Sequence, residues 1–439
     1  MNKKLIGLGM LFATNAAFAQ SAGTNSVEVY GVIDAAVGHV EYSLSADSNF
    51  PATVNPVSAS KTTVNNAVTG LFNGGIQDSR WGIRGSEDLG GGMKAFFTLE
   101  SGFNINSGAL NNATQSLASN AKASTVSANS SLDGQLFSRQ AFVGLSDSTL
   151  GSIALGRNYA PFYDIAVGYD PVQDAQLFSP LGFSGTIGGG GGVSEDTRID
   201  NSVKYKNKFG DVNVSLLYKL GGVAGNSSAQ SGFAGQIGYE AGPLGIQVAY
   251  EQFTDALKTG NPSAAAPGDI GVTDYDTTSW MVAGKYAFGD LTIRGGYETY
   301  TLKAPSDSIA SMGVTSLYGY QIDPTKAVTF AGADQKTDIW FIGGDFNFTP
   351  ALNLAVGFYD QNPKQSDDYV PTSATNSTPK TGQATGNIYS YSALLDYHFT
   401  KRTDVYAGVM YSQYKGDNYP SIAYNSSNYI TAIGLRTKF

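Results

Sequence analysis

Apolar and polar side chains alternate along most of this chain, and this period of two constrains its fold more than any other feature of the sequence. In the stretch "WMVAGKYAF" (280–288), Trp280, Val282 and Tyr286 fall on one side of an extended backbone, whereas Lys285 falls on the other. Successive side chains of a β-strand point to opposite faces. The pattern therefore predicts strands with one apolar face and one face of polar, charged or small residues.

Sixteen segments show this alternation, and no helical period is long enough to divide them. The connections alternate in length: turns such as "EDLGGG" and "FTKR" are short, whereas loops such as 43–78, 104–136 and 303–335 are long and polar. An even number of strands with tight turns at one end and long loops at the other is typical of a transmembrane β-barrel. The expected strands are 26–42, 79–87, 93–103, 137–146, 152–157, 202–208, 212–220, 233–240, 246–254, 277–288, 291–302, 336–348, 352–361, 388–399, 403–414 and 429–439.

Closure of the sheet follows from the solvent. Lipid has no hydrogen-bonding groups for an open sheet edge, so the last strand has to pair with the first. A soluble secreted β-sandwich or solenoid would also alternate, but two features count against it. Tyr, Phe and Trp gather at strand ends, as membrane interfaces require, and sixteen strands exceed what one sandwich usually holds. We therefore expect an all-β, 16-stranded antiparallel transmembrane β-barrel with short periplasmic turns and long extracellular loops.

The first twenty residues, "MNKKLIGLGMLFATNAAFAQ", have the organisation of a secretory signal peptide. Lys3 and Lys4 precede a short apolar run, and the Ala-Phe-Ala pattern that ends at Ala19 predicts cleavage before Gln20. The run is too short to cross about 30 Å of lipid as a helix. We expect a cleaved signal peptide (1–19) and a single barrel domain (20–439).

Composition excludes several classes of function. Without residues 1–19 the chain keeps 25 Lys and Arg against 36 Asp and Glu, a formal charge of −11, and it has no basic cluster, so nucleic acid is not an expected partner. The chain has no Cys, which rules out disulfides and Cys-based metal or redox sites.

No motif predicts an enzyme or a cofactor. The run of glycines at 188–192 lacks the Gly-Lys-Ser/Thr of a phosphate-binding loop, and no nucleophile elbow accompanies His398 and Asp396. No carboxylate or second His stands at metal-ligand spacing from either histidine in the sequence. "TDYD" (273–276) and "SDD" (366–368) have the composition to bind divalent ions loosely, but a solvated loop also accounts for them.

Four stretches resemble the trimeric general porins of Gram-negative outer membranes, in the branch typical of β-proteobacteria. They are "SVEVYGVIDAAV" (26–37), "SRWGIRGSEDLGGGMKAFFTLESGF" (79–103), "RQAFVGLSDSTLGSIALGRNYAPFYD" (139–164) and "GLRTKF" (434–439). The resemblance implies a homotrimer in the outer membrane, in contact with lipid and lipopolysaccharide. It also implies that the third long loop folds inward as a constriction and that the barrel assembly machinery recognises the C-terminal Phe439.

Parity indicates which cations line the lumen. Placing Arg on the lipid face near the midplane costs roughly 2–4 kcal/mol, so charges in mid-strand are expected to face inward. Arg139 breaks strict parity, and we expect either a bulge at the strand start or a place in the trimer interface; in the related family an Arg near this place can join a basic cluster on the barrel wall. Arg157 has the same conflict. The expected pore-lining basic residues are Arg80, Arg84, Lys94, Arg139, Arg198 and Lys204.

The third long loop contains no Lys or Arg between residues 158 and 196. Folded inward, it would set a negative rim opposite Arg80, Arg84 and Arg198, and the resulting transverse field would filter solutes by charge as well as by size. The arginines would alternatively only pair with loop carboxylates and fix the loop. The expected acidic residues are Asp164, Asp170, Asp174, Glu195 and Asp196.

We therefore expect a water-filled channel for passive diffusion of ions and small hydrophilic solutes, without enzymatic activity. Lumen cations favour anions, whereas the loop and the net charge favour cations, so the sequence favours neither sign. A substrate-selective channel is the alternative in the same fold, because Tyr159, Phe162, Tyr163, Tyr169 and Phe178 would suit an aromatic slide. A surface adhesin or receptor with working loops is the alternative from another class.

The double substitution Arg80→Ser with Arg84→Ser is expected to shift the reversal potential in planar bilayers toward cations, because it removes positive charge from the lumen. An unchanged reversal potential would argue against the assignment of these arginines to the pore wall.

Overall fold

The structure, a computed structural model, describes residues 25–44, 64–108, 110, 136–181, 198–259, 269–317, 320–330, 334–364, 386–416 and 425–439. The expected signal peptide (1–19) lies outside the described residues, as do Glu195, Asp196, the glycine run and the "SDD" stretch.

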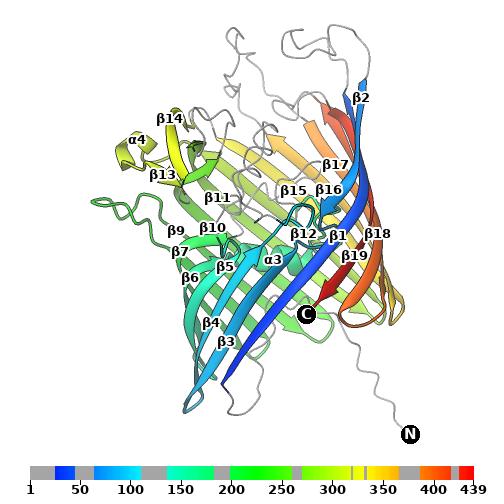
Figure 1. Cartoon of the computed structure of the whole chain (residues 1–439), viewed down its shortest axis with the longest axis horizontal. Coiled ribbons are helices and arrows are strands. Elements are labelled where there is room, and N and C mark those ends of the chain that lie inside the picture. The colour runs from blue at the N-terminus through cyan, green and yellow to red at the C-terminus, as the bar shows by residue number, and fades with distance from the viewer. Residues whose placement is uncertain are drawn as a thin grey trace.

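Sixteen antiparallel strands form a closed barrel (Figure 1). Each pairs with its neighbour along the chain, and β19 (Asn425–Lys438) closes the ring by pairing with β1 (Ser26–Leu44). This confirms the expected fold, since every one of the sixteen predicted segments overlaps a barrel strand. The others are β3 (Arg80–Gly90), β4 (Met93–Gly102), β5 (Gln140–Asp147), β6 (Gly151–Tyr159), β7 (Arg198–Phe209), β8 (Val212–Lys219), β9 (Gly232–Ala241), β10 (Leu244–Thr259), β11 (Asp269–Phe288), β12 (Leu291–Lys303), β15 (Gln335–Thr349), β16 (Leu352–Lys364), β17 (Gly386–His398) and β18 (Thr403–Gly416).

Elements that the alternation did not predict lie within the long connections. They are β2 (Val64–Asn73), α3 (Pro161–Tyr169), α4 (Ile309–Met312), β13 (Ser316–Leu317) and β14 (Tyr320–Thr329). Neither of the helices in the described residues is long and apolar enough to cross a membrane.

The second position in the barrel is occupied by a broken strand. The upper part of β1 pairs with β2, from Ala35 to Leu44, and the lower part pairs with β3, from Ser26 to Val32. Residues 74–79 separate the two strands and begin with Gly74 in a left-handed conformation (φ 79°). Residues 43–78 were expected to form one long loop, so the position of β2 within them corrects that expectation.

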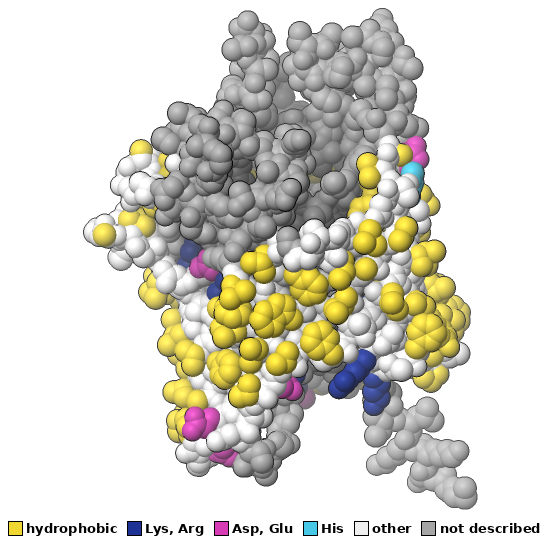
Figure 2. Space-filling view, viewed as in Figure 1, with side chains coloured by type: hydrophobic (Ala, Val, Ile, Leu, Met, Phe, Trp, Pro, Cys, Tyr) yellow, Lys and Arg dark blue, Asp and Glu magenta, His cyan; other side chains and the backbone are white. Residues whose placement is uncertain are grey.

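The outer wall of the barrel is apolar and exposed, whereas many inward side chains of the wall are buried by other parts of the protein. In β15, Trp340 and Ile342 are exposed, whereas Phe341 between them is buried on the inner side. Figure 2 shows hydrophobic side chains gathered in a band across the outer wall, with charged side chains at its margins. An exposed apolar surface of this extent needs an apolar environment, and the hydrocarbon core of a membrane supplies it.

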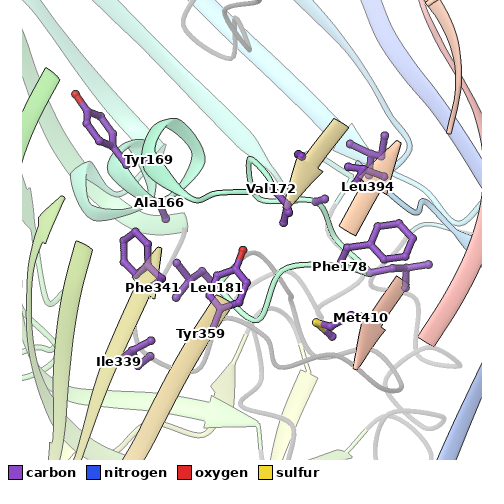
Figure 3. Close-up of a cluster of buried hydrophobic side chains, with 14 of the residues drawn as sticks. Ala166, Tyr169, Val172, Phe178, Leu181, Ile339, Phe341, Tyr359, Leu394 and Met410 are labelled. Atoms are coloured by element: carbon purple, nitrogen blue, oxygen red, sulfur yellow. The ribbon is translucent and has the colours of Figure 1, made fainter. Parts of the chain in front are cut away.

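The main apolar cluster lies inside the barrel. Residues of the connection between β6 and β7 cross the lumen and pack against inward side chains of the wall strands (Figure 3). Phe178 lies beside Leu394 and Met410, and Leu181 lies beside Tyr359. The largest fully buried side chains therefore include residues of this crossing segment and its wall partners rather than of a sandwich core.

The C-terminal residue completes the seam between the ends of the chain. The backbone N–H of Phe439 donates to the carbonyl of Gly31, and the N–H of Gly31 donates to the carbonyl of Phe439, both at 3.1 Å. The Phe439 ring covers Gly31 so closely that a Cβ there would lie 2.5 Å from its Cζ and 2.7 Å from the Arg80 carbonyl oxygen.

Gly31→Ala is therefore expected to destabilise the closed barrel by about 1–3 kcal/mol, because the backbone or the Phe439 ring has to shift. Gly70→Ala is the matched control, since nothing lies within 4 Å of the Cβ it would add. Thermal unfolding followed by the mobility of unheated and heated samples on gels measures the difference. Equal unfolding temperatures for the two variants would contradict this account of the seam.

Candidate functional site

A segment of the β6–β7 connection, residues 160–181, narrows the lumen. Pro161 occupies the first position of α3, where its fixed φ suits a helix start and no backbone donor is lost. Phe162, Ile165 and Tyr169 bury the apolar face of this helix. Figure 1 shows α3 inside the barrel, and the chain beyond it reaches the opposite wall at β16, β17 and β18 (Figure 3). Solutes that enter the barrel therefore have to pass this segment.

The crossing segment is hydrogen-bonded to the break between β2 and β3. The backbone N–H groups of Gln176 and Leu177 donate to the carbonyls of Ile76 and Gly75, at 3.0 and 2.9 Å. The Gln176 side chain also donates to Asp78, at 2.6 Å. Two segments from distant parts of the chain thus hold each other inside the lumen.

Asp34 fixes the first of these segments to the wall. Its carboxylate accepts hydrogen bonds from the backbone N–H groups of Gly75, Ile76 and Gln77, at 3.2, 3.2 and 2.8 Å, and from the Tyr406 hydroxyl. Asp34 is fully buried in β1. A carboxylate that accepts several such bonds is held in one place. Asp34 therefore fixes the position of residues 74–79, to which the crossing segment is hydrogen-bonded.

A buried ion-pair network covers the inner wall at β3, β4 and β5. Arg139 donates to Glu100 at 2.8 Å, to Asp78 at 3.0 Å and to the Tyr159 hydroxyl at 2.7 Å. Arg80 lies 3.7 Å from the second oxygen of Glu100. Both arginines face the lumen side, and both are almost fully covered.

The two arginines that broke parity point inward because the backbone is irregular at both places. Arg139 precedes the first residue of β5, and its N–H still donates to the carbonyl of Glu100. At Arg157 the register of β6 against β7 shifts between Gly156 and Asn158, and Gly156 has φ of 138°. The extra residue of this bulge is in β7, where Asp200 and Asn201 stand opposite Arg157 alone, and the irregular backbone at Gly156 changes the side that Arg157 faces. Arg157 donates to the carbonyl of Ser138 at 2.7 Å.

Lys204 and Lys206 hold the helix of the crossing segment from β7. Their Nζ atoms lie 2.9 and 2.6 Å from the Asp164 carboxylate. Lys204 also donates to the Tyr159 carbonyl, at 2.6 Å. Burial raises the pKa of Asp164, but the two ammonium groups outweigh it and lower that pKa to about 2. Asp164 is therefore ionised and pairs with the near wall, which differs from the expected rim facing the arginines.

The remaining predicted cations lie at different levels of the wall. Arg198 lies over the Tyr159 ring, with its Cζ 5.6 Å from the ring centroid. Arg84 pairs with Glu28, lies over the Tyr30 ring and is partly exposed below the network. Lys94 is partly covered at the start of β4. Arg84 and Lys94 thus do not join the residues around Tyr159.

Asp170 and Asp174 also differ from the expected exposed rim. Asp170 is fully buried and accepts hydrogen bonds from the Tyr359 hydroxyl at 2.6 Å and from the Ser179 hydroxyl at 3.1 Å. Burial raises its pKa to about 6. Asp174 accepts from the Tyr163 hydroxyl at 3.0 Å. These carboxylates fasten the segment to itself and to the far wall.

Several residues that matter here were not singled out by sequence reasoning. Asp34 and Asp78 acquire their roles only through contacts with residues far away along the chain. Tyr159 was named only for an aromatic slide, and its role as an acceptor for Arg139 was not predicted. Lys206 was available from the sequence, because it shares parity with Lys204 two residues earlier.

One group of three described residues brings its possible metal-binding atoms within 4.8 Å of one another: Asp396, His398 and Asp404. The sequence did not predict this proximity, because Asp404 comes from the neighbouring strand. Arg436 donates to Asp404 at 3.0 Å and to Asp396 at 3.4 Å, so its guanidinium already supplies positive charge to both carboxylates. The arrangement fits an ion-pair network of the wall.

Comparisons with known sequences identify one family, and comparisons with solved structures agree on the fold. A family model described as Gram-negative porin matches residues 7–417. An outer membrane porin protein of Bordetella pertussis is 27% identical over 413 residues, covering 82% of this chain and 95% of the relative. The anion-selective porin from Comamonas acidovorans has a TM-score of 0.58 at 19% identity, covering 95% of this chain and all of that one. The trimer form of OmpT from Vibrio cholerae has a TM-score of 0.53 at 13% identity, with 95% and 100% coverage.

The buried Asp170 is expected to make the hold on the crossing segment depend on pH. Its pKa is raised from 3.8 to about 6, so the buried position of the crossing segment favours the protonated form of Asp170. The contribution of Asp170 to holding the segment is therefore full below about pH 4 and is lost as the pH rises to about 6. Brief closures of single channels are therefore expected to become more frequent from pH 4 to pH 6 and to change little above pH 6. Asp170→Asn, which stays neutral, is expected to abolish this change.

Glu87→Gln is the matched control, because Glu87 is an exposed carboxylate in β3, away from the segment. It is expected to keep the wild-type pH profile. The same pH profile in Asp170→Asn as in the wild type would refute the role of Asp170.

Proposed function

Because this chain belongs to the Gram-negative porin family, we propose that it filters solutes by size and charge at the constriction formed by residues 160–181 and the basic wall of β3 to β7. As an outer membrane porin, it forms a channel through which ions and small hydrophilic solutes diffuse passively. The proposal rests on one observation above the others: a segment that crosses the lumen and is bonded to both walls.

The fixed position of the segment supports a size filter. Lys204 and Lys206 hold Asp164 on one wall, while Tyr359 holds Asp170 on the other. A segment anchored on both sides sets one aperture, since it has no freedom to follow the shape of each solute. Such a filter excludes large solutes without binding small ones.

The charges around Tyr159 support a weak preference for anions. Two unit charges about 8 Å apart interact by roughly 2 kcal/mol at an effective dielectric of 20, so an excess of even two charges matters to a passing ion. Among the described residues of this network, six cations stand against four carboxylates. The cations are Arg80, Arg139, Arg157, Arg198, Lys204 and Lys206, and the carboxylates are Asp78, Glu100, Asp164 and Asp200.

A general channel is favoured over a substrate-selective one. The alternative needed the aromatic residues of the crossing segment to form a slide along the pore. Tyr159, Phe162, Tyr169 and Phe178 are instead between 0% and 5% exposed, because they pack the segment to the wall. Tyr163 is partly buried, stacks on Tyr159 and donates to Asp174. One partly covered ring does not form a continuous slide along the pore.

We also carry over the assembly that the family implies. The chain is proposed to form a homotrimer, as the Vibrio cholerae protein does in its trimer form, within lipid and lipopolysaccharide. Cleavage before Gln20 would release the barrel domain for export, and the assembly machinery would recognise Phe439. The position of Phe439 at the seam supports this last role, because it is 50% exposed where β1 and β19 meet.

Planar-bilayer recording tests the channel. We expect a large, ohmic conductance that does not saturate with solute, together with a reversal potential that indicates an anion preference. Saturation by one solute would support the selective channel, and a silent bilayer would support the adhesin or receptor.

The two arginines of the double substitution can be separated. Arg80→Ser is expected to carry most of the shift toward cations, because Arg80 belongs to the network around Tyr159. Arg84→Ser, the matched control, is expected to have a small effect, since Arg84 is already paired with Glu28 and lies outside that network. Equal shifts would contradict the placement of the filter at this level of the wall.

A further inference from the structure

The connection between β12 and β15 folds over the outside of the barrel. Its strand β14 runs parallel to the first residues of β11, pairing from Asp269 to Asp274. Figure 1 shows α4, β13 and β14 gathered outside the wall at the end that carries the long loops. A small apolar cluster joins the two parts: Leu257, Val272, Ile309, Met312 and Ile322.

This covered surface lies beyond the membrane band. Trp280 is part of the exposed apolar surface of β11, and Asp274 lies six residues further toward the long loops. In outer membrane barrels the end with long loops faces the outside of the cell. The stretch "TDYD" therefore lies at the extracellular end of the barrel, where the surrounding ions are those of the external medium. It belongs to β11 rather than to a solvated loop, which corrects the account given from the sequence.

Four carboxylates converge beneath the outward-folded connection. Asp255 lies at a bulge in β10, with φ of 49°, and its N–H donates to Asp276 at 2.7 Å. Asp255 in turn accepts from the N–H of Asp307, at 2.7 Å. Asp274, Asp255, Asp276 and Asp307 thus come from two strands and from the connection that covers them.

Asp274 is the carboxylate that the protein leaves uncompensated. It is fully buried, and neither of its oxygens has a hydrogen-bond partner among the described residues; the backbone N–H of Ile309 is the donor that faces it. One oxygen of the fully buried Asp255 also has no donor. Among the residues whose side chains the structure describes, which do not include Lys258 and Lys326, no Lys or Arg lies within 4 Å of any of the four, although Lys303 stands opposite Asp276 in the ladder. Burying carboxylates without a partner costs several kcal/mol, so a missing cation would account for the arrangement.

We propose that Asp255, Asp274, Asp276 and Asp307 bind a hydrated divalent cation of the Mg²⁺ or Ca²⁺ type. Hard divalent cations prefer carboxylate oxygens, and Mg²⁺ usually keeps several of its waters. No three of these carboxylates bring oxygens within 4.8 Å of one another, so the ion contacts part of the set through its own water molecules. The ion pins the β12–β15 connection to the rim of β10 and β11.

Titration of Mg²⁺ and of Ca²⁺ into the EDTA-treated, lipopolysaccharide-free full barrel in detergent, followed by isothermal calorimetry, tests the proposal. We expect one site per chain with a dissociation constant on the order of 10⁻⁴–10⁻³ M, as in extracellular calcium modules. Asp274→Asn is expected to weaken binding by about tenfold or more, because the charge of the ligand set tunes affinity. Asp290→Asn, an exposed carboxylate in the β11–β12 turn at the opposite end, is the matched control and is expected to bind as the wild type does.

Asp307→Asn provides a second variant that leaves every barrel strand unchanged. It is expected to weaken binding as well, and the cation is expected to slow proteolytic cleavage between β12 and β15 in the wild type but not in this variant. Conductance is expected to stay at the wild-type value in both variants, because the cluster lies on the outer side of the wall. No saturable binding in the wild type, or unchanged binding in Asp274→Asn, would overturn the proposal without affecting the porin function.

Discussion

The backbone hydrogen bond between the two ends of the chain is the interaction on which the rest of this structure depends. Lipid offers no partner to an unpaired strand edge, so the sheet has to close. Closure puts Ser26–Leu44 beside Asn425–Lys438 and leaves Phe439 bonded to Gly31. Once the ring is closed, the period of two in each strand sends apolar side chains to the acyl chains and polar ones to the lumen.

The outer and inner faces of the wall treat charge differently. Outside, burial in lipid excludes charge, and the exposed band is apolar. Inside, arginines and lysines are covered by protein, and each needs a carboxylate, a carbonyl or an aromatic face. Arg139 illustrates this, since Glu100, Asp78 and Tyr159 all accept its donors. Some of the contacts that pair these cations also hold the crossing segment in place. The charge of the pore wall and the shape of the aperture therefore depend on the same residues.

The sequence predicts the barrel well because each strand is a local pattern and the solvent dictates closure. It predicts the inward orientation of Arg80 and Lys204 for the same reason. Strict parity fails at Arg139 and Arg157, where a strand start and a bulge change the side that a side chain faces. An irregular strand start was one of the two explanations expected for Arg139, whereas nothing in the sequence indicated the irregularity at Arg157. The sequence also misplaces Asp170 on an open rim, because the partner Tyr359 lies 189 residues away and no periodicity relates the two.

Asp34 and Tyr406 meet although 372 residues separate them, one near each end of the chain. Their contact requires the first and last strands to be already in register. Residues 74–79 are hydrogen-bonded to Asp34, and the crossing segment is hydrogen-bonded to residues 74–79. A barrel whose first and last strands have not paired therefore lacks the contact that supports the crossing segment, so the aperture of the pore depends on closure of the sheet.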